Sequence, residues 1–96
     1  MPRKQRMIAS TQALRTAQDA AAHRLVVFSQ HARTRMEQEQ ATTEDVLDAM
    51  RTAKRADPGD GVDRWRLSGG VTEDGRELCV VVALVWNPVV VTVFSK

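Results

Sequence analysis

The sequence predicts one α+β domain in which N-terminal helices pack on an antiparallel sheet of three or four strands. Residues 76–94 are dense in valine on both sides of Asn87-Pro88, a pattern typical of two strands joined by a turn. Residues 4–24 contain neither glycine nor proline and favour a helix. Helices followed by antiparallel strands define the α+β class, and 96 residues suit a single domain.

The first helix is expected within residues 1–24 as a basic N-terminal segment, and residues 25–96 are expected to form the α+β domain. The apolar stripe of this helix is thin and rich in alanine. It consists of Met7, Ile8, Leu14, Ala17, Ala21 and Leu25. A helix with so few large apolar residues gains little stability from packing. It is therefore expected to dock on a partner, pair with a second copy as a homodimer, or be only partly ordered.

Two short helices are expected next. Leu25–Phe28 reads as either a strand or the end of the first helix, because periodicity does not distinguish them. Ser29 is a plausible N-cap for a helix that continues to about Glu39. Thr42 caps the following helix, and Asp45 can return a hydrogen bond to it. That helix runs to about Arg55 with a buried stripe of Val46, Leu47, Met50 and Ala53.

The strands follow a loop at residues 57–61, which is expected to end the helix. Val62–Leu67 alternates apolar and polar residues, which indicates a half-buried strand with Trp65 in the core. Residues 68–75 form a turn-rich connection. The final hairpin is expected to pair Arg76–Val85 with Pro88–Phe94 in antiparallel fashion.

The composition excludes several classes of protein. The valine-rich stretch is interrupted by Asn87-Pro88 and does not reach the ~20 residues of a membrane helix, so no membrane partner is expected. The single cysteine, Cys79, cannot form an internal disulfide and suits a reducing cytoplasm. Two histidines and one cysteine do not recur at ligand spacing, so neither a metal site nor a cofactor is expected.

The charge is unevenly distributed. Residues 1–35 carry seven lysines and arginines against one acid, whereas residues 36–96 carry seven against eleven. This asymmetry indicates a polyanion or an acidic protein as partner. The alternative is an ordinary solvated helix face.

Three segments together resemble the small domain-of-unknown-function family 4258. His31–Met36 matches a His-Ala-x-x-Arg-Met opening, and a capped helix over Thr42–Ala53 follows at the expected interval. Asp74–Val82 is similar to the family's Asp-Gly-Arg-Pro-Leu-His-Val-Val-Val strand, and Val90–Phe94 to its closing Ile-Ile-Thr-Val-Tyr. The resemblance covers about residues 25–95.

That family occurs among toxin-like proteins of bacteria and mobile elements and is similar to RelE-type and barnase–EndoU-type ribonucleases. The resemblance therefore implies a RelE/barnase-like fold and a toxin that cleaves RNA without a metal. The implied partners are RNA and an antitoxin or immunity protein.

Four residues are candidates for catalysis. His31 would act as base or acid, or would only hydrogen-bond locally. Arg35 would clamp a phosphate, or pair with Glu39 one helical turn on. Arg76 enters a strand after a tight turn and would neutralise negative charge on the phosphate. The alternative is an exposed charge on the hairpin. Thr92 offers a hydroxyl from the last strand. We expect His31, Arg35 and Arg76 to converge on a concave face of the sheet.

Three further arginines are candidates for RNA binding. Arg64 and Arg66 flank Trp65 and point to the opposite face of their strand, where basic residues can contact RNA. Arg33 lies in the His31–Met36 segment and is assigned the same role. Solvated charges beside a core tryptophan are the alternative.

The chain also departs from the family pattern. It has Cys79 where the family often has His, Phe94 where it has Tyr, and residues 39–41 as Glu-Gln-Ala where the family favours Arg-Gly-Ile. Two proton-transfer groups are absent as a result. The alternative function is therefore a non-catalytic protein- or nucleic-acid-binding module on the same fold.

Overall fold

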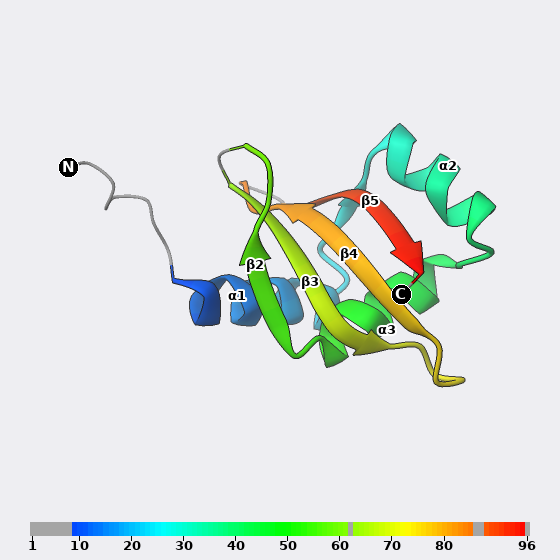
Figure 1. Ribbon diagram of the computed structural model, residues 1–96, viewed down its shortest axis with the longest axis horizontal. Coiled ribbons are helices and arrows are strands. Elements are labelled where there is room, and N and C mark those ends of the chain that lie inside the picture. Colours follow the sequence, from blue (N-terminus) through cyan, green and yellow to red (C-terminus); the bar gives the residue numbers. More distant parts are fainter. Residues whose placement is uncertain (1–8, 62, 86–87, 96) are drawn as a thin grey trace.

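The computed structural model describes residues 9–61, 63–85 and 88–95 (Figure 1). These residues form three helices and one five-stranded sheet. In chain order the elements are α1 (Ser10–Ala22), β1 (Val27–Phe28), α2 (Gln30–Gln38), α3 (Thr43–Thr52), β2 (Arg55–Pro58), β3 (Arg64–Val71), β4 (Glu77–Ala83) and β5 (Val89–Ser95). The predicted α+β class is confirmed.

The sheet has one strand more than the upper predicted number, and it is not wholly antiparallel. Its order is β1-β5-β4-β3-β2, with β1 parallel to β5 and the other neighbours antiparallel. β2 lies where the sequence predicts the end of a helix and a loop. Helix α3 stops at Thr52 because Ala53 takes an extended conformation, and the amide of Lys54 then donates to the carbonyl of Ser68 at 2.8 Å.

The predicted hairpin is confirmed as β4 and β5. Val80 pairs with Val93 and Val81 with Thr92, and the register shifts by one residue between Val81 and Val82. Asn87, half of the predicted turn, lies outside the described residues. This hairpin forms the middle of the sheet, and its valines supply much of the buried apolar surface.

β3 is longer than predicted. It continues to Val71 through an irregularity between Leu67 and Gly70, whereas the sequence predicts a strand that ends at Leu67. Val62, where the predicted strand begins, lies outside the described residues. A Cβ atom on Gly70 would lie 1.8 Å from the carbonyl oxygen of Ala49, so only glycine lets β3 approach helix α3 this closely.

Helix α1 contacts α3 and β2 of its own chain. Ala13, Ala17 and Ala21 on its inner side are buried. Their small side chains let the helix approach its neighbours closely. Leu25, which the predicted stripe includes, is 63% exposed. Met7 and Ile8 lie outside the described residues.

The predicted helix caps are confirmed. The hydroxyl of Ser29 accepts a hydrogen bond from the amide of Ala32 at 3.0 Å, which begins α2. Thr42 and Asp45 form a reciprocal capping box at the start of α3, with both hydrogen bonds at 3.0 Å.

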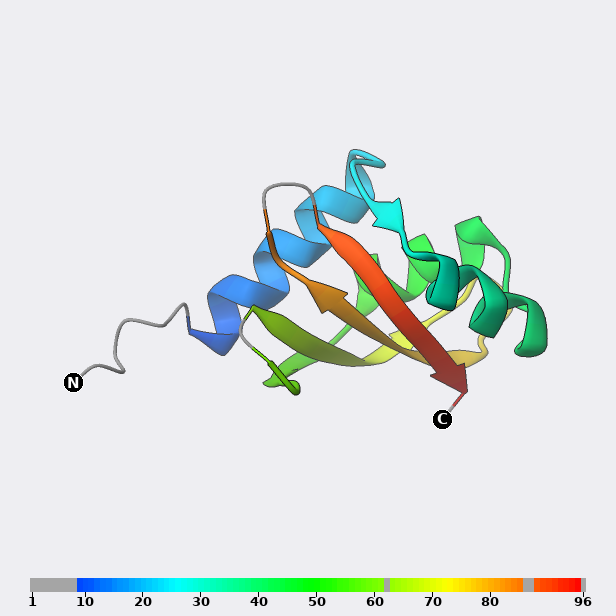
Figure 2. The ribbon, with the colours of Figure 1, turned by 90° about the horizontal axis from the view of Figure 1, so that it is seen from above.

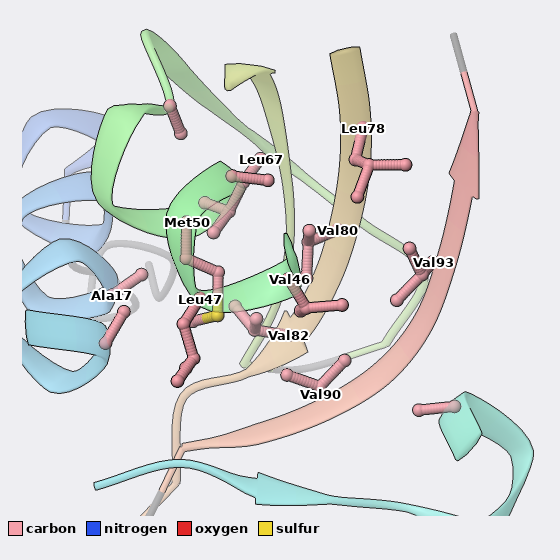
Figure 3. Close-up of a cluster of buried hydrophobic side chains, with 14 of the residues drawn as sticks. Ala17, Val46, Leu47, Met50, Leu67, Leu78, Val80, Val82, Val90 and Val93 are labelled. Carbon is pink, nitrogen blue, oxygen red and sulfur yellow. The ribbon is translucent and has the colours of Figure 1, made fainter. Parts of the chain in front are cut away.

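One face of the sheet is covered by helices. Figure 2 shows α1 and α3 on the same side, and α2 runs beside β5 and contributes Ala32 and Met36 to the core. Side chains of α3 meet alternate residues of β3, β4 and β5 there (Figure 3). The fully buried large side chains are Met50, Leu67, Leu78, Val46, Val80, Val82, Val90 and Val93. Trp65 packs against this core as predicted.

Candidate nucleic-acid interface

The other face of the sheet is covered by none of the described helices (Figures 1 and 2). We call it the open face. Because side chains alternate along a strand, its members follow from the register of the core residues. They are Arg55, Asp57, Arg64, Arg66, Ser68, Val71, Glu77, Cys79, Val81, Ala83, Val27, Val89, Thr92 and Phe94.

The arginines of the open face lie on β2 and β3. Arg64 and Arg66 are two residues apart on β3 and both are exposed. Arg55 on β2 is also exposed, and its guanidinium lies 3.0 Å from the carboxylate of Asp57. Three cations therefore share one part of a solvent-facing sheet.

A row of four residues crosses the open face. Asp57 is opposite Arg66, Arg66 is opposite Val81, and Val81 is opposite Thr92. Neighbouring strands lie about 4.8 Å apart, so the row is about 14 Å long. It places Thr92 on the same face as two of the predicted RNA-binding arginines, Arg64 and Arg66.

Phe94 and Cys79 form the neighbouring pair on this face. Phe94 is half-buried, and Cys79 is buried even though it lies on the face without helices. Phe94 is the aromatic side chain that the described part of the open face presents to a ligand.

A second group of polar residues lies at the end of α2. Arg35 pairs with Glu39 at 3.2 Å, which is the alternative that the sequence left open for Arg35. Arg76 donates to the carbonyl oxygens of Glu39 at 2.9 Å and Gln40 at 3.1 Å, and it lies 3.9 Å from the Asp45 carboxylate. The structure therefore brings Arg35 and Arg76 to the same residue, Glu39.

Glu39 also fastens the end of β5. Its carboxylate accepts hydrogen bonds from the hydroxyl of Ser95 at 2.6 Å and from the amide of Ser95 at 3.2 Å. The hydrogen bond from the Ser95 hydroxyl, the amide of Ser95, and the charges of Arg35 and Arg76 hold the pKa of Glu39 below its usual value. The carboxylate is therefore a structural anion that joins α2 to β5.

His31 and Arg33 lie in the first half of α2, and both are exposed. The guanidinium carbon of Arg33 is 5.8 Å from the centre of the Phe28 ring, a cation–π contact. His31 is eight residues before Glu39, which corresponds to about 12 Å of helix. Arg76 is bound at the far end of α2, so the structure does not place it with His31 around one phosphate.

The sequence does not predict the positions of Asp57 on the open face and of Glu39 between α2 and β5. A loop is expected at Asp57, because residues 57–61 form a run rich in glycine, proline and aspartate, whereas the structure places Asp57 in β2. Glu39 is expected only as a partner of Arg35, whereas its contacts with Ser95 and Arg76 join residues far apart in sequence. The i, i+4 spacing of Arg35 and Glu39 is the one local signal for this group.

Among residues 9–61, 63–85 and 88–95, no group of three or more histidine, cysteine or acidic side chains could hold a metal ion. In the same residues no helix combines the length and the apolar composition needed to cross a bilayer.

The chain matches one described protein family. The family described as domain of unknown function DUF4258 matches residues 28–95, which include every described element except α1 and the first residue of β1. No curated protein and no solved structure matches the chain. Since the match spans well over half of the sequence, the chain belongs to the DUF4258 family.

Proposed function

We propose that this protein binds RNA on the open face and cleaves it without a metal, as a toxin-like protein similar to RelE-type and barnase–EndoU-type ribonucleases. The observation that supports this most is the set of arginines Arg55, Arg64 and Arg66 on a sheet face without helices. Arginine guanidinium groups bind phosphates through paired hydrogen bonds, and a half-buried aromatic such as Phe94 can stack on a base.

The row Asp57–Arg66–Val81–Thr92 supplies groups that RNA cleavage requires. The 2′-hydroxyl must lose a proton to a base, and cations must stabilise the charge that develops on the phosphate. Asp57 lies on β2 opposite Arg66 of β3, and its carboxylate is 3.0 Å from the guanidinium of Arg55 on the same strand, so a candidate base and two cations are neighbours. His31 is the other proton-transfer candidate, and it lies on α2.

The second candidate function is a non-catalytic binding module. It is favoured by the contacts of Arg35 and Arg76, whose guanidinium groups already bind Glu39, Gln38 and Gln40 of the same chain. Arginines used in this way hold the fold together. The open face would then bind RNA or a protein without chemistry.

The test is inducible expression in a bacterial host, followed by incubation of the purified protein with RNA in excess EDTA. The double variant Arg64→Ala, Arg66→Ala should lose RNA binding and toxicity, since each lost phosphate contact weakens binding and lowers the salt dependence. Arg15→Ala, an exposed arginine on α1, is the matched control and should behave as wild type.

Two further variants identify the base. If Asp57 is the base, Asp57→Asn should abolish cleavage and leave RNA affinity nearly unchanged, while His31→Ala should retain cleavage; the reverse result would assign the base to His31. Wild-type protein that binds RNA but neither cleaves it nor inhibits growth would establish the binding module. Absence of RNA binding would refute both RNA-based functions.

A further inference from the structure

The open face has an apolar part beside its arginines. Val27 pairs with Val89 and Val89 with Ala83, so three neighbouring strands, β1, β5 and β4, present these small apolar side chains on one face. Val27 is 52% exposed. Val85, two residues after Ala83, is also large and exposed. We call Val27, Ala83, Val85 and Val89 the apolar strip.

The position of Val85 follows from its neighbour. Leu84 packs against the core, and its amide donates to the carbonyl of Asp63 at 2.8 Å. Ala83 and Val85 therefore flank a residue that packs on the core, and Ala83 lies on the open face opposite Arg64. Val85 is 49% exposed.

Cations border the apolar strip. Ala83 pairs with Arg64, so the strip on β1, β5 and β4 is followed by Arg64 on the next strand, with Arg66 two residues further along. The open face is thus apolar at one side and positively charged at the other. Exposed apolar side chains that cluster beside charges are typical of sites where a protein partner binds.

We propose that the open face is the docking surface for an acidic amphipathic helix of a partner protein. The apolar side of that helix would cover the apolar strip, and its carboxylates would reach Arg64 and Arg66. The three strands of the strip span about 10 Å, which matches the diameter of one helix. A helix bound there would cover the second face of the sheet, as α1 and α3 cover the first.

The chemistry of the face selects this occupant. RNA would use the arginines and leave Val27 and Val85 in water, whereas an apolar helix side would bury them. In a symmetric pair of identical chains, the arginines of each copy would need an acidic counterpart on the other copy. The acidic residues of the open face are Asp57, which is already paired with Arg55, and Glu77, which lies at the opposite end of β4 from Ala83. Acidic residues on a different protein provide that counterpart.

The test uses a synthetic peptide of about 18 residues, with leucine on one helical face and glutamate on the other. A peptide of the same composition in scrambled order is the control probe, and binding is measured by fluorescence anisotropy. The amphipathic peptide should bind about tenfold tighter or more, because only its order forms an apolar face. Equal binding of the two peptides would overturn the proposal.

Variants of the chain locate the contact. Val27→Asp and Val85→Asp should each weaken peptide binding about tenfold, since both place a charge in the apolar contact. Val71→Asp is the matched control, an exposed valine at the far end of β3, and it should leave binding unchanged. Thermal unfolding of each variant checks the fold, and Arg64→Glu should weaken binding without removing any apolar side chain. Equal effects of the three aspartate variants would contradict the proposed position.

Two further experiments distinguish the proposed helix from a second copy of the chain and from RNA. A wild-type dimer in sedimentation that Val27→Asp dissociates would assign the apolar strip to a second copy and overturn the proposal. The overlap with RNA rests on the proposed function: RNA should displace the peptide, because both use Arg64 and Arg66. RNA binding without displacement would refute the overlap and leave RNA binding intact, whereas absence of RNA binding would refute the proposed function alone.

Discussion

The guanidinium of Arg76 lies 2.9 Å from the carbonyl oxygen of Glu39, although the two residues are 37 positions apart in the chain. A second nitrogen of Arg76 reaches the carbonyl of Gln40 at 3.1 Å. The last carbonyl groups of a helix have no partner within the helix, and they carry partial negative charge. Arg76, just before β4, therefore closes the C-terminal end of α2.

Arg76→Ala should destabilise the protein by about 1–2 kcal/mol, because two hydrogen bonds from a charged group to the helix end are lost and the side chain is partly exposed. Arg76→Lys should recover part of the loss, since a single ammonium cannot reach both carbonyls equally well. Urea unfolding measures both, and Arg51→Ala on the exposed side of α3 controls for the lost charge. Loss of RNA affinity at unchanged stability would show that Arg76 binds the ligand instead.

Gln40→Gly should stabilise the protein by about 1 kcal/mol. Gln40 has φ +55, a left-handed conformation that costs side-chain-bearing residues about 1–2 kcal/mol, and glycine offsets part of this gain by its greater freedom when unfolded. The amide of Ala41 donates to the carbonyl of Met36 and that of Gln40 to Glu37, the Schellman arrangement in which glycine is preferred. Urea unfolding tests this, with Gln38→Gly inside α2 as a control that should lower stability.

The acid dependence of stability should contain a contribution from Glu39. Its folded pKa lies below the usual glutamate value, so its contribution is present above about pH 4.5 and is lost as the pH falls through the lowered folded pKa. Glu39→Gln should flatten this part of the stability curve between pH 5 and pH 3, as measured by urea unfolding at several pH values. Glu37→Gln controls for removing one carboxylate from the same helix, and a profile for Glu39→Gln as steep as that of wild type would refute the assignment.

Gly70→Ala should prevent folding or cost several kcal/mol. The added methyl group would lie 1.8 Å from the carbonyl oxygen of Ala49, so β3 and α3 would have to separate. Gly75→Ala is the comparison: its φ is +89, and apart from its chain neighbours no described residue lies within 4 Å of the place that a methyl group would take. Only backbone strain of about 1 kcal/mol is therefore expected there. Thermal unfolding distinguishes the two, and equal losses would argue against the close approach at Gly70.

The parts of the fold that local patterns determine could be predicted from the sequence. The valine runs around Asn87-Pro88 predict the β4–β5 hairpin, and Thr42 with Asp45 predicts the start of α3. β2 could not be predicted, because Arg-Ala-Asp-Pro becomes a strand only through pairing with β3, where Ala56 lies opposite Leu67 and is buried. Its place in the sheet depends on tertiary contacts that exceed its weak propensity.

In the candidate site, too, local patterns could be predicted and contacts between distant segments could not. The pairing of Arg35 with Glu39 follows from helical spacing, and the exposure of Arg64 and Arg66 follows from strand alternation. The binding of Arg76 to the end of α2 could not be predicted, since it depends on how a helix and a distant strand meet. The expected meeting of Arg76 with His31 failed for this reason.

The position of β5 in the sheet constrains how the chain is assembled during synthesis. β5 follows the other four described strands in the chain, yet it lies between β1 and β4 in the sheet. Ser29 donates a hydrogen bond to the carbonyl of Val91, 62 residues later, so β1 and the start of α2 have no neighbour in the sheet until β5 leaves the ribosome. Contacts this distant in sequence form late and slowly. A nascent chain that stops before Val89 would therefore lack both β5 and the docked β1, and the open face would be completed only after translation has passed β5.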